Sequence, residues 1–264
     1  MIKLIAIDMD NTLLNDKKQI PAEFNALVNA CKARDICVVI ASGRPLYTLK
    51  EMFAECKDDL SFIADNGGLV EYQKQIISQD LMKKEIVEKI VSEAYELEDS
   101  CVILCGIEHA SVDKRRLMDE SYIREFYKTM KVVDDLSTVH ENIDKVTLYS
   151  RTHIRSIFES YIRPNYGETY ECVVSDTVWA DITNRHVNKG NGIRQLLKTM
   201  GIDRSEAMAF GDFDNDIEML KAVEESYVMA NAPEYMHQYG KHIAPSNNEQ
   251  GVIKVIKEKV LQID

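Results

Sequence analysis

Short apolar runs alternate with amphipathic segments through the first third of the chain. The runs at 3–8, 37–42 and 61–65 have the length and composition of buried strands. The segments between them, 21–34 and 46–56, place apolar residues at helical spacing. Strands that alternate with helices of this length predict crossover connections and a parallel sheet.

The same alternation returns in the last third of the chain. Helical and strand-like segments follow one another there, at 189–201, 206–212, 215–223, 226–231, 233–240 and 248–261. Gly201 is expected to end the first of these helices, because glycine readily takes the left-handed conformation of a helix terminus. The two outer parts, 1–81 and 187–264, therefore predict one α/β domain with a doubly wound, Rossmann-like parallel sheet.

The middle of the chain has a different pattern. Helical spacing is found at 81–97, 122–130 and 154–162. Strand-like runs occupy 101–107, 110–112, 145–150, 170–175 and 179–183, and the last two resemble a hairpin across Asp176 and Thr177. Strand pairs interleaved with helices predict an α+β domain inserted at 82–186, which splits the doubly wound domain.

Composition narrows the class of protein and of partner. The 264 residues are 45% apolar and 29% charged, which is typical of an ordered globular chain. A net charge of −12 argues against a nucleic acid or an anionic membrane as partner, since both need a basic face. No apolar run approaches the ~18 residues of a membrane-spanning helix. The six cysteines form no paired frame, so we expect reduced core thiols and a cytoplasmic protein.

Polar residues follow every predicted strand of the parallel sheet. The strand exits are Asp8–Thr12, Ser42–Arg44, Asp65–Gly68, Gly211–Asp216 and Asn231. Ligands of open parallel sheets bind beyond the carboxyl ends of the strands, so these side chains should converge. Converging carboxylates need a positive partner, and oxygen ligands on a tight scaffold suit Mg²⁺. With Lys189, and with Arg44 as a further cation, the set matches the needs of phosphoryl transfer.

Four motifs in this order resemble those of the haloacid dehalogenase superfamily. They read DMDNTLL (8–14), ASGR (41–44), VNKGNGI (187–193) and GDFDNDIEML (211–220). The IADNGG stretch, the NAP tripeptide and the insert after the third strand narrow the resemblance to the Cof-type phosphatases of subfamily IIB. The resemblance extends over the whole chain, and it implies a hydrolase core with the insert as a cap that chooses the substrate.

The resemblance implies a catalytic role for three residues. Asp8 corresponds to the nucleophile that attacks phosphorus, and Asp10 to the acid that protonates the leaving oxygen and then activates water. Lys189 would neutralise charge on Asp8 and on the phosphate. An acid at position 10 favours a phosphatase over a dehalogenase, because an alkoxide leaving group needs a proton.

The resemblance also implies residues that bind the cofactor Mg²⁺ and the substrate. The metal would be held by Asp8, by the backbone carbonyl of Asp10 and by Asp212, with Asp216 steadying a metal-bound water. The residues expected to reach the substrate are Ser42, Gly43, Arg44, Asn66 and Asn215. Ser42 and the Gly43 N–H would hydrogen-bond a phosphoryl oxygen, whereas Arg44 either contacts substrate or braces its loop.

Two other binding motifs do not fit. Asp212, Asp214 and Asp216 alternate as in a calcium loop, but Ile217 and Val223 stand where that loop requires Gly and Glu. The glycines after Lys189 do not form a dinucleotide fingerprint, because its third glycine is replaced by Gln195. Taken alone, Asp8 and Asp10 also fit a solvated strand end.

These observations predict an Mg²⁺-dependent phosphatase that acts on small phosphorylated metabolites, with sugar phosphates as the expected class. Two alternatives remain open on the sequence. One is a phosphomutase or phosphotransferase of the same subfamily, in which an acceptor hydroxyl replaces water. The other is a non-enzymatic regulator that binds a phosphorylated ligand, although a pure binder needs no nucleophile and acid pair. Both a monomer and a homodimer fit the sequence.

Overall fold

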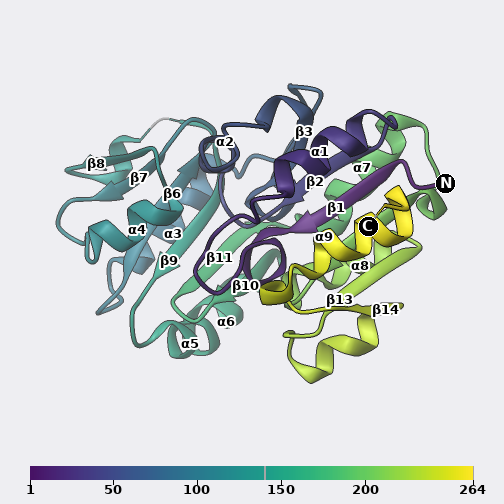
Figure 1. Cartoon of the computed structure of the whole chain (residues 1–264). Helices are drawn as coiled ribbons and strands as arrows, with labels where there is room; N and C mark the ends of the chain where they lie inside the picture. The colour runs from purple at the N-terminus through teal and green to yellow at the C-terminus, as the bar shows by residue number, and fades with distance from the viewer. Residues whose placement is uncertain (140, 264) are drawn as a thin grey trace. The chain divides into compact units, whose positions relative to one another are not determined.

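The computed structural model describes residues 1–139 and 141–263, without the side chain of Asp176 (Figure 1). The chain divides into two compact units. The first unit comprises residues 1–42, 53–78 and 188–264, and the second comprises 43–52 and 79–187. The second unit thus contains the whole predicted insert, 82–186, and also the short stretch that follows Ser42. A substrate-selecting role for the insert at 82–186 stays a prediction.

The first unit contains an eight-stranded sheet in the order β14-β13-β12-β1-β2-β3-β4-β5. Six of its strands are parallel: β1 (Leu4–Asp8), β2 (Cys37–Ala41), β3 (Leu60–Ala64), β12 (Ala207–Gly211), β13 (Glu225–Met229) and β14 (His242–Ala244). The five strands expected from apolar runs are all among them, which confirms the doubly wound α/β class.

Three strands at the edges of this sheet were not expected. They are β14 and the pair β4 (Leu69–Tyr72) and β5 (Gln75–Gln79), of which β4 runs antiparallel to β3. Every residue of β5 is at least partly exposed, so its side chains lack the continuous apolar run of a buried strand. The sheet is therefore mixed at this edge and not wholly parallel.

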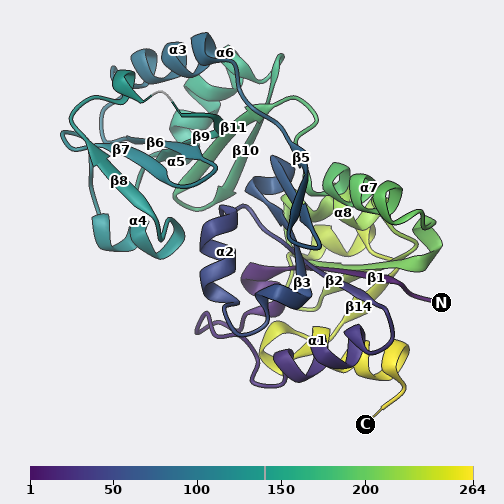
Figure 2. The same ribbon diagram turned by 90° about the horizontal axis from the view of Figure 1, so that it is seen from above.

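Helices cover both faces of this sheet. The helices of the first unit are α1 (Phe24–Lys32), α7 (Lys189–Met200), α8 (Ile217–Ala222) and α9 (Gly251–Ile256). Figure 2 shows α7 and α8 on one face and α1 on the other. Gly201 ends α7 with a φ of 65°, as expected from the sequence.

Two helices of the first unit are shorter than the sequence pattern indicates. The segment 21–34 becomes helical only at Phe24. The segment 248–261 begins its α-helix at Gly251, because Ser246 and Glu249 form a capping box around a separate turn and Gln250 takes a φ of 58°. In the second case a polar capping box therefore delays the start of the helix within the apolar pattern.

The second unit contains a six-stranded sheet in the order β10-β11-β9-β6-β7-β8. Its strands are β6 (Cys101–Gly106), β7 (Ala110–Asp113), β8 (Met130–Val133), β9 (Ile143–Tyr149), β10 (Tyr170–Asp176) and β11 (Trp179–Asn184). The expected hairpin is β10 and β11, and only the pair β7 and β8 is parallel among the pairings described. The helices are α2 (Leu46–Met52), α3 (Lys84–Ala94), α4 (Glu120–Phe126), α5 (Ile154–Ile157) and α6 (Arg163–Tyr166).

One expected helix is wrong in its second half. The spacing of Tyr122, Phe126 and Met130 predicts a helix over 122–130, but α4 ends at Phe126 and Met130 begins β8. Tyr127 leaves the helical conformation, with φ −116° and ψ 77°. Met130 then pairs with Ala110 of β7, so strand pairing overrides the helical pattern.

All six cysteines are free thiols, and Cys31, Cys56, Cys101 and Cys105 are buried, as expected of reduced core thiols. Within the described residues, none of the helices has the length and apolar character needed to cross a bilayer.

Candidate active site

The carboxyl ends of β1 and β12 bring two aspartates to one edge of the first unit's sheet. The strands are parallel and in register at Ile7 and Phe210, so Asp8 at the end of β1 lies level with Gly211. Asp212 follows directly after Gly211. Both carboxylates are buried, with 6% of Asp8 and 5% of Asp212 exposed.

A lysine from the start of α7 links these strand ends. Asn188 caps the helix by accepting a hydrogen bond from the N–H of Asn191, which places Lys189 in the first turn. Lys189 is fully buried, and its Nζ donates to Asp8 Oδ1 at 2.5 Å and to Asp216 Oδ1 at 2.6 Å. A buried ammonium at this position requires such partners, because an uncompensated charge is strongly unfavourable inside a protein.

Asp216 closes the loop after β12. Its Oδ2 accepts hydrogen bonds from the backbone N–H of Asp212 at 2.9 Å and from that of Phe213 at 3.2 Å. A Cβ on Gly211 would lie only 2.5 Å from the Cβ of Asp216, so the turn requires glycine there. The local chain therefore holds Asp212 at a fixed point beyond the strand.

Helices α7 and α8 approach each other closely beside this loop. A Cβ on Gly190 would lie 2.3 Å from the carbonyl oxygen of Glu218 in α8. The glycine that follows Lys189 thus permits the packing that brings the lysine to Asp216.

Asp8, Asp212 and Asp216 form what we call the carboxylate cluster. One ligand oxygen of each lies within 4.8 Å of the others. Burial is the main cause that raises the pKa of Asp8, and the charges of Asp216 and Asp212 raise it further. Burial and the charge of Asp216 raise the pKa of Asp212 to about 7.

The same surroundings favour the charged form of Lys189, whereas they disfavour the charged forms of Asp8 and Asp212. Burial disfavours its charge, yet the neighbouring carboxylates of Asp216 and Asp8 together hold its pKa above the usual value. Three carboxylates then face one ammonium, which leaves two negative charges in excess when all are ionised. A divalent cation with oxygen ligands fits this excess and this donor set.

The two oxygens of Asp216 are already bound, one by Lys189 and the other by backbone N–H groups. Asp8 and Asp212 are therefore the carboxylates best suited to direct contact with a metal ion. Asp216 therefore braces Lys189 and the loop, and its expected role beside a metal-bound water stays a prediction.

Ser42, Asn66 and Asn215 are connected in the first unit. Asp8 pairs with Ala41 at the end of β2, so Ser42 follows at the same sheet edge. The carbonyl of Ser42 accepts a hydrogen bond from the N–H of Asn66 at 3.0 Å, and Asn66 Oδ1 accepts one from Asn215 Nδ2 at 3.1 Å. These three expected substrate residues thus belong to one hydrogen-bonded chain.

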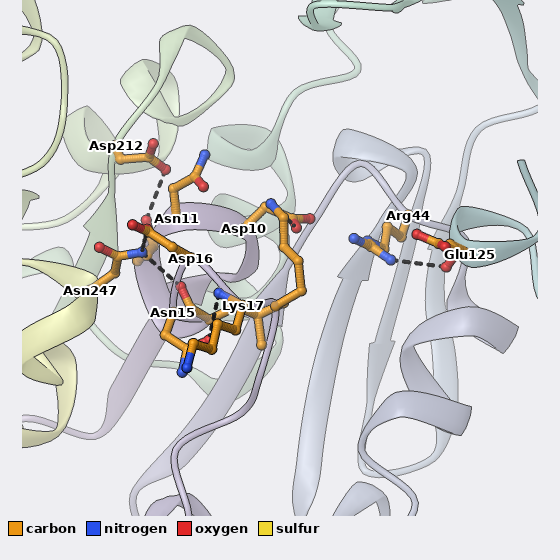
Figure 3. Close-up of polar contacts among 12 residues, drawn as sticks. Asp10, Asn11, Asn15, Asp16, Lys17, Arg44, Glu125, Asp212 and Asn247 are labelled. Atoms are coloured by element: carbon orange, nitrogen blue, oxygen red, sulfur yellow. Dashed lines mark hydrogen bonds and ion pairs between the residues drawn. The ribbon is translucent and has the colours of Figure 1, made fainter. Parts of the chain in front are cut away.

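Gly43 and Arg44 belong to the second unit. The carbonyl of Gly43 accepts a hydrogen bond from Lys145 Nζ at 2.6 Å. Arg44 Nη1 donates to the carbonyl of Glu125 at 3.1 Å (Figure 3). Its guanidinium lies 4.4 Å from the ring centre of Phe126. These contacts fit the expectation that Arg44 braces its loop, and its contact with substrate stays a prediction.

Two contacts at the site were not expected from the sequence. Thr12 is buried, and its Oγ1 donates to Asp212 Oδ1 at 3.0 Å. Lys18 Nζ donates to Asp10 Oδ1 at 3.0 Å. Thr12 and Asp212 are 200 positions apart, so no local pattern connects them.

Comparison with known proteins places this arrangement in a family. Residues 5–256 match the family described as haloacid dehalogenase-like hydrolase. The chain belongs to this family of hydrolases. It is 33% identical over 263 residues to the 5-amino-6-(5-phospho-D-ribitylamino)uracil phosphatase YbjI of Escherichia coli K12, over 99% of this chain and 97% of that protein.

A second curated protein and a solved structure are also similar to the hydrolase over nearly its whole length. A Bacillus subtilis protein of the same name, YcsE, is 25% identical over 261 residues, covering 98% of this chain and 96% of its own. The crystal structure of SMU.1108c from Streptococcus mutans UA159 is 29% identical with a TM-score of 0.89, over 99% of this chain and all of that one. Full-length relatives that are named phosphatases identify the hydrolase as an enzyme of the phosphatase type.

Proposed function

We propose that this hydrolase cleaves small phosphorylated metabolites, with Mg²⁺ as cofactor and Asp8 as nucleophile. The observation that carries the proposal is the buried contact of Lys189 with both Asp8 and Asp216, beside Asp212. A buried carboxylate held by an ammonium at a strand end is an activated nucleophile next to its own charge neutraliser. A protein that only binds phosphate has no need for a nucleophile.

In the first step, Asp8 attacks phosphorus and the bond between phosphorus and the leaving oxygen breaks. Asp10 gives its carboxyl proton to that oxygen, so the product leaves as an alcohol. Lys189 keeps the attacking carboxylate oriented and offsets charge on the phosphoryl oxygens. Ser42 and the Gly43 N–H would donate hydrogen bonds to the same oxygens.

In the second step, water attacks the aspartyl-phosphate on Asp8. Asp10 now accepts a proton from that water, and the bond between Asp8 and phosphorus breaks to release inorganic phosphate. The Asp8 carboxylate is restored, and Asp10 again carries the proton with which it began. Atoms and charge therefore balance over the cycle without a co-reactant other than water.

Mg²⁺ would be held by Asp8, Asp212 and the backbone carbonyl of Asp10, with Asp216 bracing the loop. When bound, it supplies charge neutralisation for the phosphoryl group. The two excess negative charges of the carboxylate cluster and the raised pKa values of Asp8 and Asp212 support this site. Bound cation and protons would compete for these carboxylates.

We further propose a sugar phosphate or a sugar-alcohol phosphate as the substrate class. The relatives from Escherichia coli and Bacillus subtilis are named for a phosphorylated ribityl compound, which has several hydroxyls. The second unit has buried polar side chains on neighbouring strands, where Thr147 Oγ1 donates to Asp181 Oδ1 at 2.7 Å. Lys145 on the same strand as Thr147 is only 1% exposed. Buried groups of this kind suit a hydroxylated leaving group, and they support the second unit as the cap.

The test is a screen of phosphate esters with and without Mg²⁺, scored by kcat/KM. The panel contains sugar phosphates, nucleotides, pyridoxal phosphate, flavin mononucleotide, 5-amino-6-(5-phospho-D-ribitylamino)uracil and p-nitrophenyl phosphate. We expect Mg²⁺-dependent release of phosphate, with the highest kcat/KM for a sugar or ribityl phosphate. Asp8→Asn should reduce kcat/KM by at least about 10³-fold.

Asp214→Asn is the matched control, since Asp214 is exposed in the same loop and accepts a hydrogen bond from Tyr235. It should retain activity within about twofold. Transfer of the phosphoryl group to a second sugar in place of water would favour the phosphotransferase or mutase alternative. If no ester in the panel is cleaved by the wild-type protein with Mg²⁺, the proposal is wrong and a phospho-ligand binder remains.

A further inference from the structure

Lys18 lies beside the carboxyl group to which the proposed mechanism assigns the proton transfers. Its Nζ is 3.0 Å from Asp10 Oδ1. The two side chains are partly exposed, at 50% for Lys18 and 30% for Asp10. An exposed ion pair of this kind contributes only about 0–1 kcal/mol to stability.

A hydrogen-bonded turn positions Lys18 beside Asp10. Asn15 Oδ1 accepts hydrogen bonds from the N–H groups of Lys17 and Gln19, each at 3.0 Å. The N–H of Lys18 donates to the carbonyl of Asn15 at 2.8 Å. Lys18 has a φ of 58°, a left-handed conformation that is uncommon for residues other than glycine. The turn therefore keeps Lys18 in a conformation that its sequence does not favour by itself.

The segment that includes this turn is also tied to the last part of the first unit. Asn247 is 1% exposed, and its Nδ2 donates to the carbonyl of Leu14 at 3.0 Å and to Asp16 Oδ1 at 3.1 Å. Asn231 Nδ2 donates to the carbonyl of Asn11 at 2.8 Å. Figure 3 shows Asn247 and Asp16 directed toward one another beside the loop that begins at Asp10. Both halves of the segment from Asp10 to Lys18 are thus anchored.

We infer that Lys18 is a positioning residue for Asp10, and this inference rests on the proposed function. Lys18 donates to Oδ1 and so holds the carboxyl group in one orientation. In the first step, the carboxyl proton of Asp10 passes to the leaving oxygen as the bond between that oxygen and phosphorus breaks. In the second step, the Asp10 carboxylate takes a proton from the attacking water. A displaced carboxyl weakens both transfers, because proton transfer requires hydrogen-bond distance in the reacting complex.

Two esters that differ in their need for a proton test this inference. The nitrophenolate of p-nitrophenyl phosphate leaves as a stable anion, whereas p-nitrobenzyl phosphate releases an alkoxide that must be protonated. The value of kcat/KM covers the steps up to departure of the leaving group, so it isolates the acid step. Each ester is assayed with the wild-type enzyme, Lys18→Met, Lys18→Arg and Lys17→Met at saturating Mg²⁺.

We expect Lys18→Met to lower kcat/KM at least about tenfold for the benzyl ester and less than about twofold for the phenyl ester. Lys18→Arg should retain most of the wild-type kcat/KM for the benzyl ester. Lys17→Met removes the same charge from the same turn, where Lys17 is exposed and contributes its backbone N–H. It should leave both esters unchanged. In an Asp10→Asn background, Lys18→Met should have no further effect on the benzyl ester.

An equal loss for both esters would overturn the inference, since it would place Lys18 on the phosphate that the two share. No loss for either ester would overturn it as well. So would a wild-type enzyme that cleaves only the phenyl ester, because no acid step would exist for Lys18 to support. A wild-type enzyme that cleaves neither ester, nor any ester of the wider panel, refutes the proposed function instead.

Discussion

Thr12 supports the carboxylate cluster through a single hydroxyl. It is buried, and its Oγ1 donates to one oxygen of Asp212. Asp212 receives no backbone hydrogen bond of the kind that fixes Asp216, among the contacts described for the cluster. The orientation of a proposed metal ligand therefore depends on a side chain from the loop after β1. Such outer partners of metal ligands typically affect metal affinity 10- to 100-fold, as an order of magnitude.

Thr12→Val keeps the shape of the side chain and removes this hydrogen bond. We expect the Mg²⁺ concentration for half-maximal activity to rise by about tenfold, while the free energy of unfolding falls by only about 1 kcal/mol. Titration of phosphatase activity with Mg²⁺ and urea unfolding measure the two effects. Thr199→Val, at an exposed position of α7, serves as the control. An unchanged Mg²⁺ requirement would show that Thr12 does not orient Asp212.

Asp113 is the centre of a polar contact in the second unit. Arg115 donates to both of its oxygens, with Nη2 at 2.6 Å from Oδ2, and Tyr95 donates its hydroxyl at 2.5 Å. The side chain of Asp113 is only 1% exposed. Hydrogen bonding from Arg115 is the largest cause that lowers the pKa of Asp113 to about 2.

The pKa of Asp113 predicts a pH-dependent contribution to stability. The folded value lies below that of an unfolded aspartate, about 3.9, so the contribution is complete above about pH 4 and is lost as pH falls toward 2. Asp113→Asn should therefore lower the free energy of unfolding by about 2 kcal/mol at pH 7 and by clearly less at pH 3. Urea unfolding of both proteins measures this gap. An equal gap at both pH values, or the same loss in exposed Asp134→Asn, would contradict the assignment.

At the scale of elements, the site depends on how closely α7 and α8 pack. Lys189 starts α7, and the next residue, Gly190, faces the backbone of α8 at Glu218. A side chain there must push the helices apart, since the nearest atom is a backbone oxygen that cannot rotate away. The same movement would draw Lys189 from the carboxylates of Asp8 and Asp216.

Gly190→Ala should lower both stability and activity. We expect about 1–3 kcal/mol of destabilisation from overpacking and a fall in kcat of about 10²-fold from displacement of Lys189. Gly201→Ala is the control at the other end of the same helix, where φ is +65° and nothing lies within 4 Å of an added Cβ. It should cost about 1 kcal/mol through backbone strain and leave kcat unchanged. Urea unfolding and steady-state kinetics separate the two variants, and equal kcat values would refute the packing argument.

At the scale of the whole molecule, charge and stability are coupled through the carboxylate cluster. The chain has a net charge of −12, and three of its carboxylates are buried around one ammonium. A cation that binds only the folded protein stabilises it by mass action. The size of that effect reports occupancy of the site without relying on catalysis.

We expect Mg²⁺ at about 100 times its dissociation constant to stabilise the protein by about 2.7 kcal/mol, and chelation by EDTA to reverse this shift. Thermal unfolding in Mg²⁺, compared with potassium chloride at equal ionic strength, measures it as a change in Tm. Asp212→Asn should remove most of the shift, whereas Asp214→Asn should retain it. A Tm that responds to ionic strength alone would argue against a metal site in the cluster.

Much of the fold could be predicted because the strands at the centre of the first sheet are buried on both faces. Strands such as Leu4–Asp8 and Ala207–Gly211 are buried throughout and almost wholly apolar. Such a run can be recognised without knowing which strands pair with it. The edge strands β4, β5 and β14 escaped prediction because they are short or exposed. Met130 was assigned to a helix because its spacing from Phe126 is helical. Its pairing with Ala110 could not be predicted from the neighbouring residues alone.

The sequence by itself determined which residue types stand at the ends of the strands, and in which order. The strand ends predicted that Asp8 and Asp212 converge, because parallel strands end at one edge of a sheet. The resemblance of the four motifs implied the roles of Asp8, Lys189 and Asp212. Only the tertiary structure decided that Thr12 holds Asp212, that Asp216 has both oxygens bound, and that Lys18 reaches Asp10. The physical reason is that periodicity records whether a side chain is buried. The identity of its hydrogen-bond partner depends instead on loop conformation and on segments distant in the chain.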